Sequence, residues 1–411
     1  MAKKEKEVIV GLDLGTTKIC CVIAEVRDGG GLDIIGIGTH PSKGLNKGVV
    51  INIESTVESI KCAVEEAELM AGVEIESAYV GIAGGHIKGF NSHGIIAVKS
   101  REVTEQDKER VIEAAKAVAI PLDREVIHVI PQQFILDGQS GIREPRGMSG
   151  VRLEARIHVI TGAVTSAQNI VRSVNRAGLD VDDIIVEQLA SAEAVLDTDE
   201  RDLGVALVDI GGGTADLALF AEDSVRYTSV IAVGGNHITS DLAIGLRTPQ
   251  VEAEKIKRKH GCAMSSMVRR DEQVEIPSMG GREPRLISRN VLCEIIEPRV
   301  EEMFQMIHRD LETSGYLGVI PSGLVITGGA SIMEGMPEAA ERVFGLPVRL
   351  GNPKGVGGLV DVVNSPQYAT AVGLLLFGDR TRKTGERKPI KGRNMFNNIT
   401  DKMKGWMEDF F

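Results

Sequence analysis

The stretch VGLDLGTT at residues 10–17 has a near copy, LVDIGGGT, at residues 207–214, almost half the chain further on. In each copy an apolar run ends in an aspartate, turns on glycine and threonine, and leads into a second apolar run, Ile19 to Ile23 or Leu217 to Phe220. Each copy therefore predicts a β-hairpin, and the repetition predicts two related half-molecules.

These turns have the chemistry of a phosphate site. Glycines without a Cβ atom let backbone N–H groups approach an anion closely, and threonine hydroxyls add donors. An aspartate would repel phosphate, so Asp13 and Asp209 imply an intervening cation. We expect two hairpins that hold one polyphosphate from both sides, with a metal ion between the aspartates. The predicted phosphate contacts are Gly15, Thr16, Thr17, Lys18, Gly211, Gly212, Gly213 and Thr214.

A third glycine turn follows the strand predicted at Leu324 to Thr327, where Gly328 and Gly329 leave the backbone open to a flat ligand. Between the second and third turns, Glu254 and Lys257 are neighbours on one face of the helix predicted from Gln250. Taken alone they are better read as an exposed ion pair worth roughly a few tenths of a kcal/mol. Their position favours the alternative, a pair that reaches the ribose and adenine edge.

Candidates for catalysis are few. Only Glu187 or Gln188 is placed to orient a water against a terminal phosphate, although a polar residue at a strand end is the default interpretation. The histidines are scattered without metal-ligand spacing, and the sequence has no Ser/His/Asp pattern.

Length and composition limit the function classes. A chain of 411 residues exceeds what one hydrophobic core usually supports, so at least two domains are expected. A net charge of −11 argues against a general nucleic-acid binder. The five scattered cysteines indicate reduced thiols in the cytosol. We expect no secretory signal or spanning helix at the N-terminus, because Asp13 and Lys18 interrupt its apolar run.

The pattern along the chain predicts an inserted unit and a helical region. Strand-like segments flank one helix, Glu105 to Val118, between residue 86 and about residue 162, which indicates a small α/β insertion. After residue 235 helices dominate, and Pro298 is expected to kink or interrupt the longest, Ser288 to Leu311. The intervening stretch Ala263 to Pro284 is predicted to be poor in strands, and a helix is predicted from Tyr368 to Phe377.

Several of these segments resemble the signature of the actin-like ATPase superfamily. They are a first phosphate turn at Asp13 to Lys18, a connecting segment at Val186 to Leu196, a second phosphate turn at Asp209 to Asp216, an adenosine turn at Ile326 to Ser331 and a second connecting helix at Tyr368 to Leu376. The resemblance implies an α/β actin-like fold of two duplicated ribonuclease-H-like domains around a nucleotide cleft. It also implies ATP with Mg²⁺ as ligand: Asp13 and Asp209 would organise the metal through water, and Glu254, Lys257, Gly328 and Gly329 would hold the nucleoside. Sugar kinases, chaperone ATPases and filament proteins all remain open.

The C-terminal segment combines a basic linker with an amphipathic helix. Residues 380–393 are rich in lysine and arginine, and Gly385, Pro389 and Gly392 make the stretch a poor helix or strand. Beyond it, apolar side chains recur at helical intervals, as in a helix that lies in a membrane interface without spanning it. A helix docked on the protein's own core or in a partner's groove is the alternative, but each Lys or Arg near an anionic leaflet adds about 1 kcal/mol. The apolar residues are Met395, Phe396, Ile399, Met403, Trp406, Met407, Phe410 and Phe411.

Together, the actin-like core, the insertion, the linker and the terminal helix closely resemble the FtsA family of bacterial cell-division proteins, over essentially the whole chain. The stretch VEQLASAEAVL at residues 186–196 is similar to the family's connecting segment, and Ile296-Glu297-Pro298-Arg299 is similar to its long-helix motif. The resemblance implies a first lobe of residues 8–85, 163–198 and 361–378, an inserted subdomain of residues 86–162 in place of actin's subdomain 1B, a second lobe of residues 199–234 and 312–360, a helical subdomain of residues 235–311, a basic linker of residues 379–393 and a membrane helix of residues 394–411.

The family resemblance also implies a function. Filaments of the protein would lie on the cytoplasmic face of the cell membrane at the division septum, tether filaments of the tubulin-like FtsZ and recruit later division proteins. The helical subdomain would receive the acidic, apolar C-terminal peptide of FtsZ, with Arg285, Arg289 and Arg299 as contacts. Nucleotide is expected to serve assembly, with weak or no ATPase activity, and nucleic acid is not expected as a partner. The competing interpretations are a soluble phosphotransferase of the same superfamily and a pilus-assembly adaptor of actin-like fold.

Overall fold

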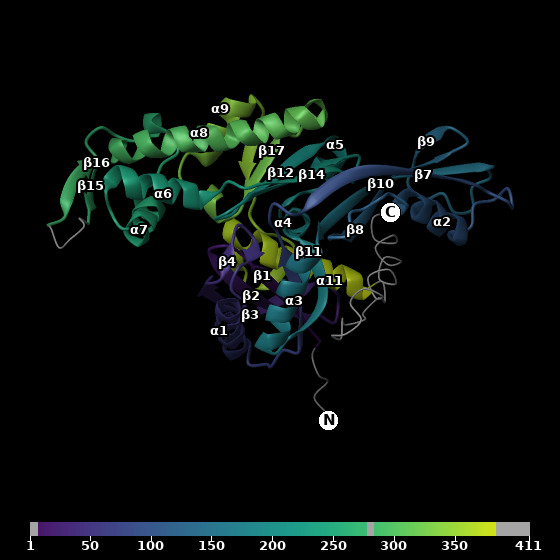
Figure 1. The fold of residues 1–411 in the computed structure, drawn as a ribbon, viewed down its shortest axis with the longest axis horizontal. Coiled ribbons are helices and arrows are strands. Elements are labelled where there is room, and N and C mark those ends of the chain that lie inside the picture. The colour runs from purple at the N-terminus through teal and green to yellow at the C-terminus, as the bar shows by residue number, and fades with distance from the viewer. Residues whose placement is uncertain (1–6, 278–282, 384–411) are drawn as a thin grey trace.

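The computed structural model describes residues 7–277 and 283–383, in which two large sheets form the centres of two lobes (Figure 1). A separate four-stranded sheet lies at one end of the molecule, and a group of helices lies at the other. The α/β fold class predicted from the sequence is confirmed, and the order of strands in the two large sheets shows the duplication.

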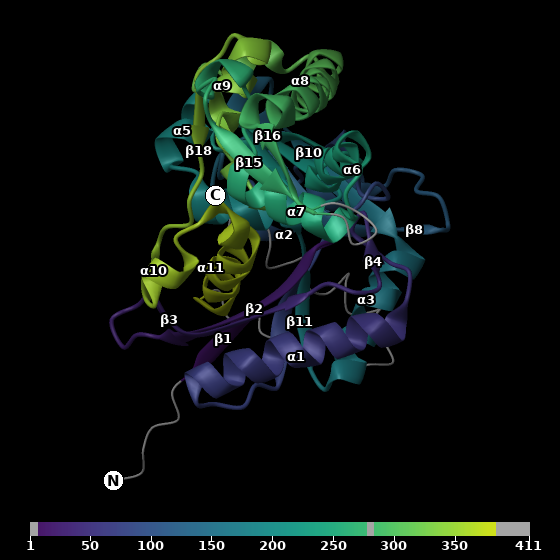
Figure 2. The same ribbon diagram turned by 90° about the vertical axis from the view of Figure 1, so that its left-hand side faces the viewer.

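The first lobe is built on a six-stranded sheet of order β11-β6-β1-β2-β3-β19. Most of its strand residues are buried, because helices cover both faces. On one face α1 packs against β3, and on the other α11 packs against β1 (Figure 2). The strands are β1 (Val8–Leu14), β2 (Lys18–Val26), β3 (Leu32–Pro41), β6 (Ser77–Ile82), β11 (Asp180–Val186) and β19 (Val356–Gly358), and the helices are α1 (Ile53–Ala71), α3 (Val164–Ala177), α4 (Glu187–Val195) and α11 (Ala369–Lys383). A short hairpin, β4 (Leu45–Asn46) and β5 (Val49–Val50), joins β3 to α1.

The second lobe repeats the central part of the first. Its sheet has the order β14-β13-β12-β17-β18, in which β12 pairs antiparallel with β13 and parallel with β17, as β1 pairs with β2 and β6. The strands are β12 (Val205–Ile210), β13 (Ala215–Ala221), β14 (Ser224–Ile231), β17 (Leu324–Thr327) and β18 (Val348–Leu350). The helices that accompany or extend it are α5 (Thr198–Leu203), α6 (Gly235–Leu246), α7 (Gln250–His260), α8 (Arg289–Ser314) and α9 (Met336–Phe344). Helix α10 (Val360–Val363) follows β19, and its Val363 is buried in the core of the first lobe.

The predicted insertion is a subdomain with its own hydrophobic core. It consists of β7 (Lys88–Ala97), α2 (Glu105–Lys116), β8 (Arg124–Leu136), β9 (Gln139–Ile142) and β10 (Arg152–Ala163). Although the chain enters it from the first lobe, it docks on β14 of the second. His158 Nε2 lies 2.8 Å from Thr228 Oγ1, and Gln132 Nε2 donates to the Val225 carbonyl at 2.8 Å. The insertion therefore connects both lobes.

Local predictions differ from the structure in the helical region. The described residues of the stretch Ala263 to Pro284 are poor in strands, as predicted, but the sequence did not indicate the short strand β15 (Gln273–Ile276), which pairs with β16 (Arg285–Ser288). Helix α8 continues through Pro298 without interruption, since buried side chains such as Ile296 and Val300 hold it on both sides of the proline.

Two predicted boundaries are wrong. The basic linker does not begin at residue 379, because α11 extends to Lys383, where Asp379 pairs with Arg382 at 3.0 Å and with Lys383 at 2.7 Å. The second lobe does not reach residue 360, because β19 pairs with β3 of the first lobe.

The membrane prediction concerns residues that the structure does not describe. The rest of the linker and the helix of residues 394–411, with Met395 to Phe411, lie outside the described residues. Among the helices of the described part, none has the length and apolar character needed to cross a membrane.

Candidate functional site

The two phosphate turns predicted from the sequence face each other across the junction of the lobes. A Cβ atom on Gly212 would lie 2.0 Å from Thr17 Oγ1, and one on Gly213 would lie 2.8 Å from Thr16 Oγ1. Any side chain at these two glycines would drive the turns apart. Within the described residues, Thr17 Oγ1 is buried and has no hydrogen-bond partner.

Carboxylates gather beneath the turns. Asp13 and Asp209 are the second-last residues of β1 and β12. Asp216 faces Asp209 across the β12–β13 pair, and Glu187 begins α4. We call these residues the carboxylate cluster. Burial and mutual repulsion raise the pKa of Asp13, Asp216 and Glu187 above the usual range of carboxyl groups.

Hydroxyl groups solvate two members of the cluster: Thr214 Oγ1 donates to Asp216 at 2.7 Å, and two hydroxyls donate to Asp209. Burial raises the pKa of Asp209, and the hydrogen bonds donated by Ser191 and Thr370 oppose this shift. Ser191 comes from α4 and Thr370 from α11, the two segments that resembled connecting helices. Both hydroxyls and Asp216 escaped the sequence prediction, although the alternation of β13 could have indicated that Asp216 faces inward.

The oxygen atoms of the carboxylate cluster are ligands of the kind that a hard divalent cation prefers. Its carboxylates carry more negative charge than the nearby Lys18 can balance, and Asp216 Oδ1 is buried without a hydrogen-bond partner in the described residues. In the same part of the chain, no three His, Cys, Asp or Glu side chains converge closely enough to ligate a metal directly. The residues therefore fit Mg²⁺ that is held mainly through water and phosphate oxygens.

The two candidate catalytic residues lie in different surroundings. Glu187 belongs to the cluster, and its Cγ would be 3.1 Å from a Cβ atom on Gly81. Gln188 is fully buried, and the structure gives neither of its amide atoms a partner among the described residues. The structure thus brings Glu187 to the carboxylates, and the role of Gln188 remains a prediction.

The side chain of Lys18 contacts the segment just before α11. Its Nζ donates to the Gln367 carbonyl at 2.8 Å and lies 4.1 Å from the centre of the Tyr368 ring. Its charge still lowers the pKa of Asp13. The predicted contact of Lys18 with phosphate remains a prediction.

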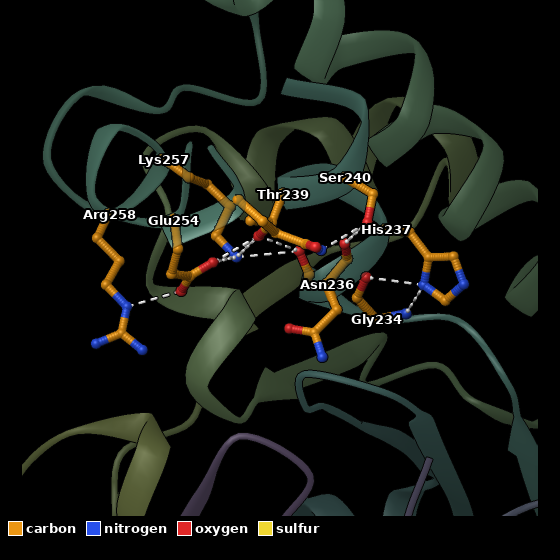
Figure 3. A network of polar contacts seen from close by, with 10 residues as sticks. Gly234, Asn236, His237, Thr239, Ser240, Glu254, Lys257 and Arg258 are labelled. Carbon is orange, nitrogen blue, oxygen red and sulfur yellow. Dashed lines mark hydrogen bonds and ion pairs between the residues drawn. The ribbon is translucent and has the colours of Figure 1, made fainter. Parts of the chain in front are cut away.

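Glu254 and Lys257 form part of a partly buried network rather than an exposed pair (Figure 3). Lys257 Nζ lies 2.7 Å from Glu254 Oε2, and it donates to the Gly235 carbonyl at 3.0 Å and to Thr239 Oγ1 at 2.8 Å. Arg258 Nε donates to Glu254 at 2.7 Å. The network joins α7 to the beginning of α6, where Gly235 N donates to the Gly211 carbonyl of the second phosphate turn at 3.0 Å.

The third glycine turn closes the same region. A Cβ atom on Gly235 would be 3.2 Å from Ala330 and 3.3 Å from Lys257 Nζ, and one on Gly328 would be 2.3 Å from Asp209 Oδ1. Gly328 has a positive φ of 85°, which favours glycine. Gly329 follows it in the same turn. The structure therefore brings all three turns and the Glu254–Lys257 pair around one site.

Family models match two parts of the chain. One described as "Cell division protein FtsA" matches residues 206–373, and one described as "SHS2 domain inserted in FTSA" matches residues 84–161, which is the insertion.

Curated relatives match nearly the whole chain. The cell division protein FtsA of Pseudomonas aeruginosa is 51% identical over 410 residues, 98% of either chain. That of Escherichia coli K12 is 43% identical and covers 94% of either chain, and that of Bacillus subtilis is 39% identical over 93% of this chain and 86% of its own length.

Solved structures with low sequence identity share the fold. A PilM-PilN type IV pilus biogenesis complex has a TM-score of 0.65 at 18% identity, over 90% of this chain and 98% of that one. MreB5 of Spiroplasma citri bound to ADP has a TM-score of 0.56 at 15% identity, over 92% and 99%. A MamK double helical filament has a TM-score of 0.52 at 13% identity, over 90% and 98%. The fold is actin-like.

Proposed function

Since this chain belongs to the FtsA family of cell division proteins, we propose that it binds ATP with Mg²⁺ between its lobes and self-associates into filaments. By the same proposal, its C-terminal helix holds the filaments on the cytoplasmic face of the cell membrane at the division septum, where they tether FtsZ and recruit later division proteins. The single observation that supports nucleotide binding best is the meeting of two duplicated turns over the carboxylate cluster.

In this proposal each element of the site has one task. The backbone of Gly15 and of Gly211 to Gly213 binds phosphate, together with the hydroxyls of Thr16, Thr17 and Thr214. Asp13 and Asp209 hold Mg²⁺ through water, and Mg²⁺ supplies the positive charge that the carboxylates and phosphates need. Glu254, Lys257, Gly328 and Gly329 hold the nucleoside. The MreB5 structures, solved with ADP and with AMPPNP on the same fold, support this assignment.

Turnover of ATP is proposed to be slow. A general base has to be ionised at the working pH, but burial and the neighbouring aspartates raise the pKa of Glu187 well above its usual range. Glu187, which lies among the carboxylates, is the first candidate for orienting a water, and Gln188, whose buried amide has no partner among the described residues, is the second. Nucleotide then acts chiefly as an assembly cofactor, and the MamK filament supports self-association of this fold.

The contact with FtsZ is proposed to centre on Arg285. Arg289 pairs with Glu272 and Glu334, and Arg299 pairs with Asp241 and Glu302, so these two arginines stabilise the helical subdomain. Arg285 is exposed and donates to the Leu246 carbonyl, which brings β16 beside the end of α6. Leu286 and Ile244 in these elements are 67% and 76% exposed, which suits an apolar, acidic peptide.

A substitution at the meeting point of the turns tests nucleotide binding. Gly212→Ala places a methyl group against Thr17, so we predict that its affinity for ATP with Mg²⁺ falls at least about tenfold, as measured by calorimetric titration. Gly318→Ala is the matched control, because a Cβ atom there meets nothing within 4 Å. ATP binding by Gly212→Ala as tight as by the parent protein would contradict the site.

Co-sedimentation with liposomes that contain anionic lipid tests the membrane tether. We predict that the full chain pellets and that a chain ending at Lys383 stays in solution. This endpoint keeps α11 and its ion pairs intact. A full-length Trp406→Glu chain should also stay in solution, whereas Asn397→Asp, which changes the predicted polar face, should still pellet. Equal pelleting of the full and shortened chains would reopen the soluble phosphotransferase and the pilus adaptor.

Charge reversal tests the FtsZ contact. We predict that Arg285→Glu weakens binding of an FtsZ C-terminal peptide about fivefold or more in fluorescence anisotropy, because it places like charges together. Arg270→Glu, at another exposed arginine of the same subdomain, should bind like the parent protein. Unchanged peptide binding by Arg285→Glu would remove Arg285 from the contact.

A further inference from the structure

The hairpin β4–β5 is a part of the site that sequence reasoning did not single out. Its two-residue turn consists of Lys47 and Gly48, with φ angles of 48° and 76°. This is the left-handed pair typical of a type I′ turn, which favours Asn-Gly and Gly-Gly. Lysine is uncommon at the first of these positions, so contacts of Lys47 with its surroundings are expected to hold this conformation.

The turn lies between the two phosphate turns. Gly48 N donates to Thr16 Oγ1 at 3.0 Å, so the hairpin holds the first phosphate turn. The Lys47 Cα would be 3.0 Å from a Cβ atom on Gly213, so its backbone contacts the second phosphate turn. Lys47 Nζ donates to the Ala232 carbonyl of the second lobe at 3.3 Å, just after β14. One residue thus contacts the second lobe twice.

The other side of the hairpin is fixed to the first lobe. Leu45 and Val50 are buried in its core. A Cβ atom on Gly48 would be 2.8 Å from the Gly84 nitrogen, at the point where the chain leaves β6 for the inserted subdomain. The hairpin is therefore a short arm of the first lobe, anchored on both strands, and it presents Lys47 to the second lobe.

We propose that Lys47 is a positioning residue that sets the separation of the two phosphate turns and thereby favours a nucleoside triphosphate over a diphosphate. This inference rests on the proposed nucleotide binding. A triphosphate has one phosphate more than a diphosphate to fit between the two turns, so its binding would depend more on their separation. Lys47 can contact Ala232 and Gly213 only when the two phosphate turns are at the separation seen in this structure. A site that is held in its binding geometry before the ligand arrives favours the ligand that needs this geometry, here the triphosphate.

Titration of Lys47→Asn with ATP and with ADP, each with Mg²⁺, tests this role. Asparagine suits the first position of a type I′ turn, so the variant keeps the hairpin and loses the ammonium group. We predict that ATP affinity falls about fivefold while ADP affinity changes less than about twofold. Lys47→Arg, which keeps a cation able to reach the Ala232 carbonyl, should recover most of the preference. Lys43→Asn removes the same charge from an exposed position in the same connection and should bind like the parent protein.

The outcomes separate this inference from the proposed function. A parent protein that binds neither nucleotide would overturn both. If the parent protein binds ATP and Lys47→Asn keeps the same ratio of ATP to ADP affinity, only the role of Lys47 falls. An equal loss for ATP and ADP would also overturn it, because a residue that holds the lobes together in general would weaken both ligands alike.

Discussion

The rest of the structure depends on one constraint: the carboxylate cluster is buried beneath the two phosphate turns, and these turns are in contact with each other. Burial and repulsion hold the pKa values of Asp13, Asp216 and Glu187 above the usual range, so ionising these groups opposes folding unless positive charge is supplied. The turns above them approach so closely that Gly212 and Gly213 have no room for a side chain. A cation and an anion together would satisfy both halves of the site. The cation would neutralise the carboxylates, and the anion would accept hydrogen bonds from the backbone N–H groups and Thr17.

The same constraint determines how the lobes are joined. Three of the contacts that link them are the hydrogen bond of Lys47 with Ala232, the bond of Thr370 with Asp209, and the docking of the inserted subdomain on β14 through His158 and Thr228. Burial lowers the pKa of His158 to about 4, so the imidazole is neutral at physiological pH and can hydrogen-bond at this junction without the cost of a buried charge. Any change in the relative position of the lobes has to be accommodated at all three contacts.

Much of this architecture was predictable because it is encoded locally. Strand β17 and helix α7 have the predicted bounds, and the duplicated turns gave both the fold and the candidate ligand. Long-range contacts were not predictable. Glu254 and Lys257 look like an exposed pair until α6 supplies Thr239, and the sequence does not indicate that the Gln367 carbonyl accepts a hydrogen bond from Lys18. The basic residues that end α11 resemble a linker until Asp379 pairs with them.

The central claim is that the carboxylate cluster is a cation site. The most direct test compares the melting temperature of Asp13→Asn with that of the parent protein. The raised pKa of Asp13 means that its contribution to stability is present below the ordinary carboxyl pKa and is lost as pH rises through the folded-state value. Without ligand at pH 7.5, the variant should therefore melt above the parent protein, by about 2 °C or more, and the difference should vanish towards pH 4. With ATP and Mg²⁺ the order should reverse, because only the parent protein gains the bound cation. The account would be contradicted if Asp13→Asn melted below the parent protein without ligand. It would also be contradicted if ATP and Mg²⁺ raised the melting temperature of the variant as much as that of the parent protein.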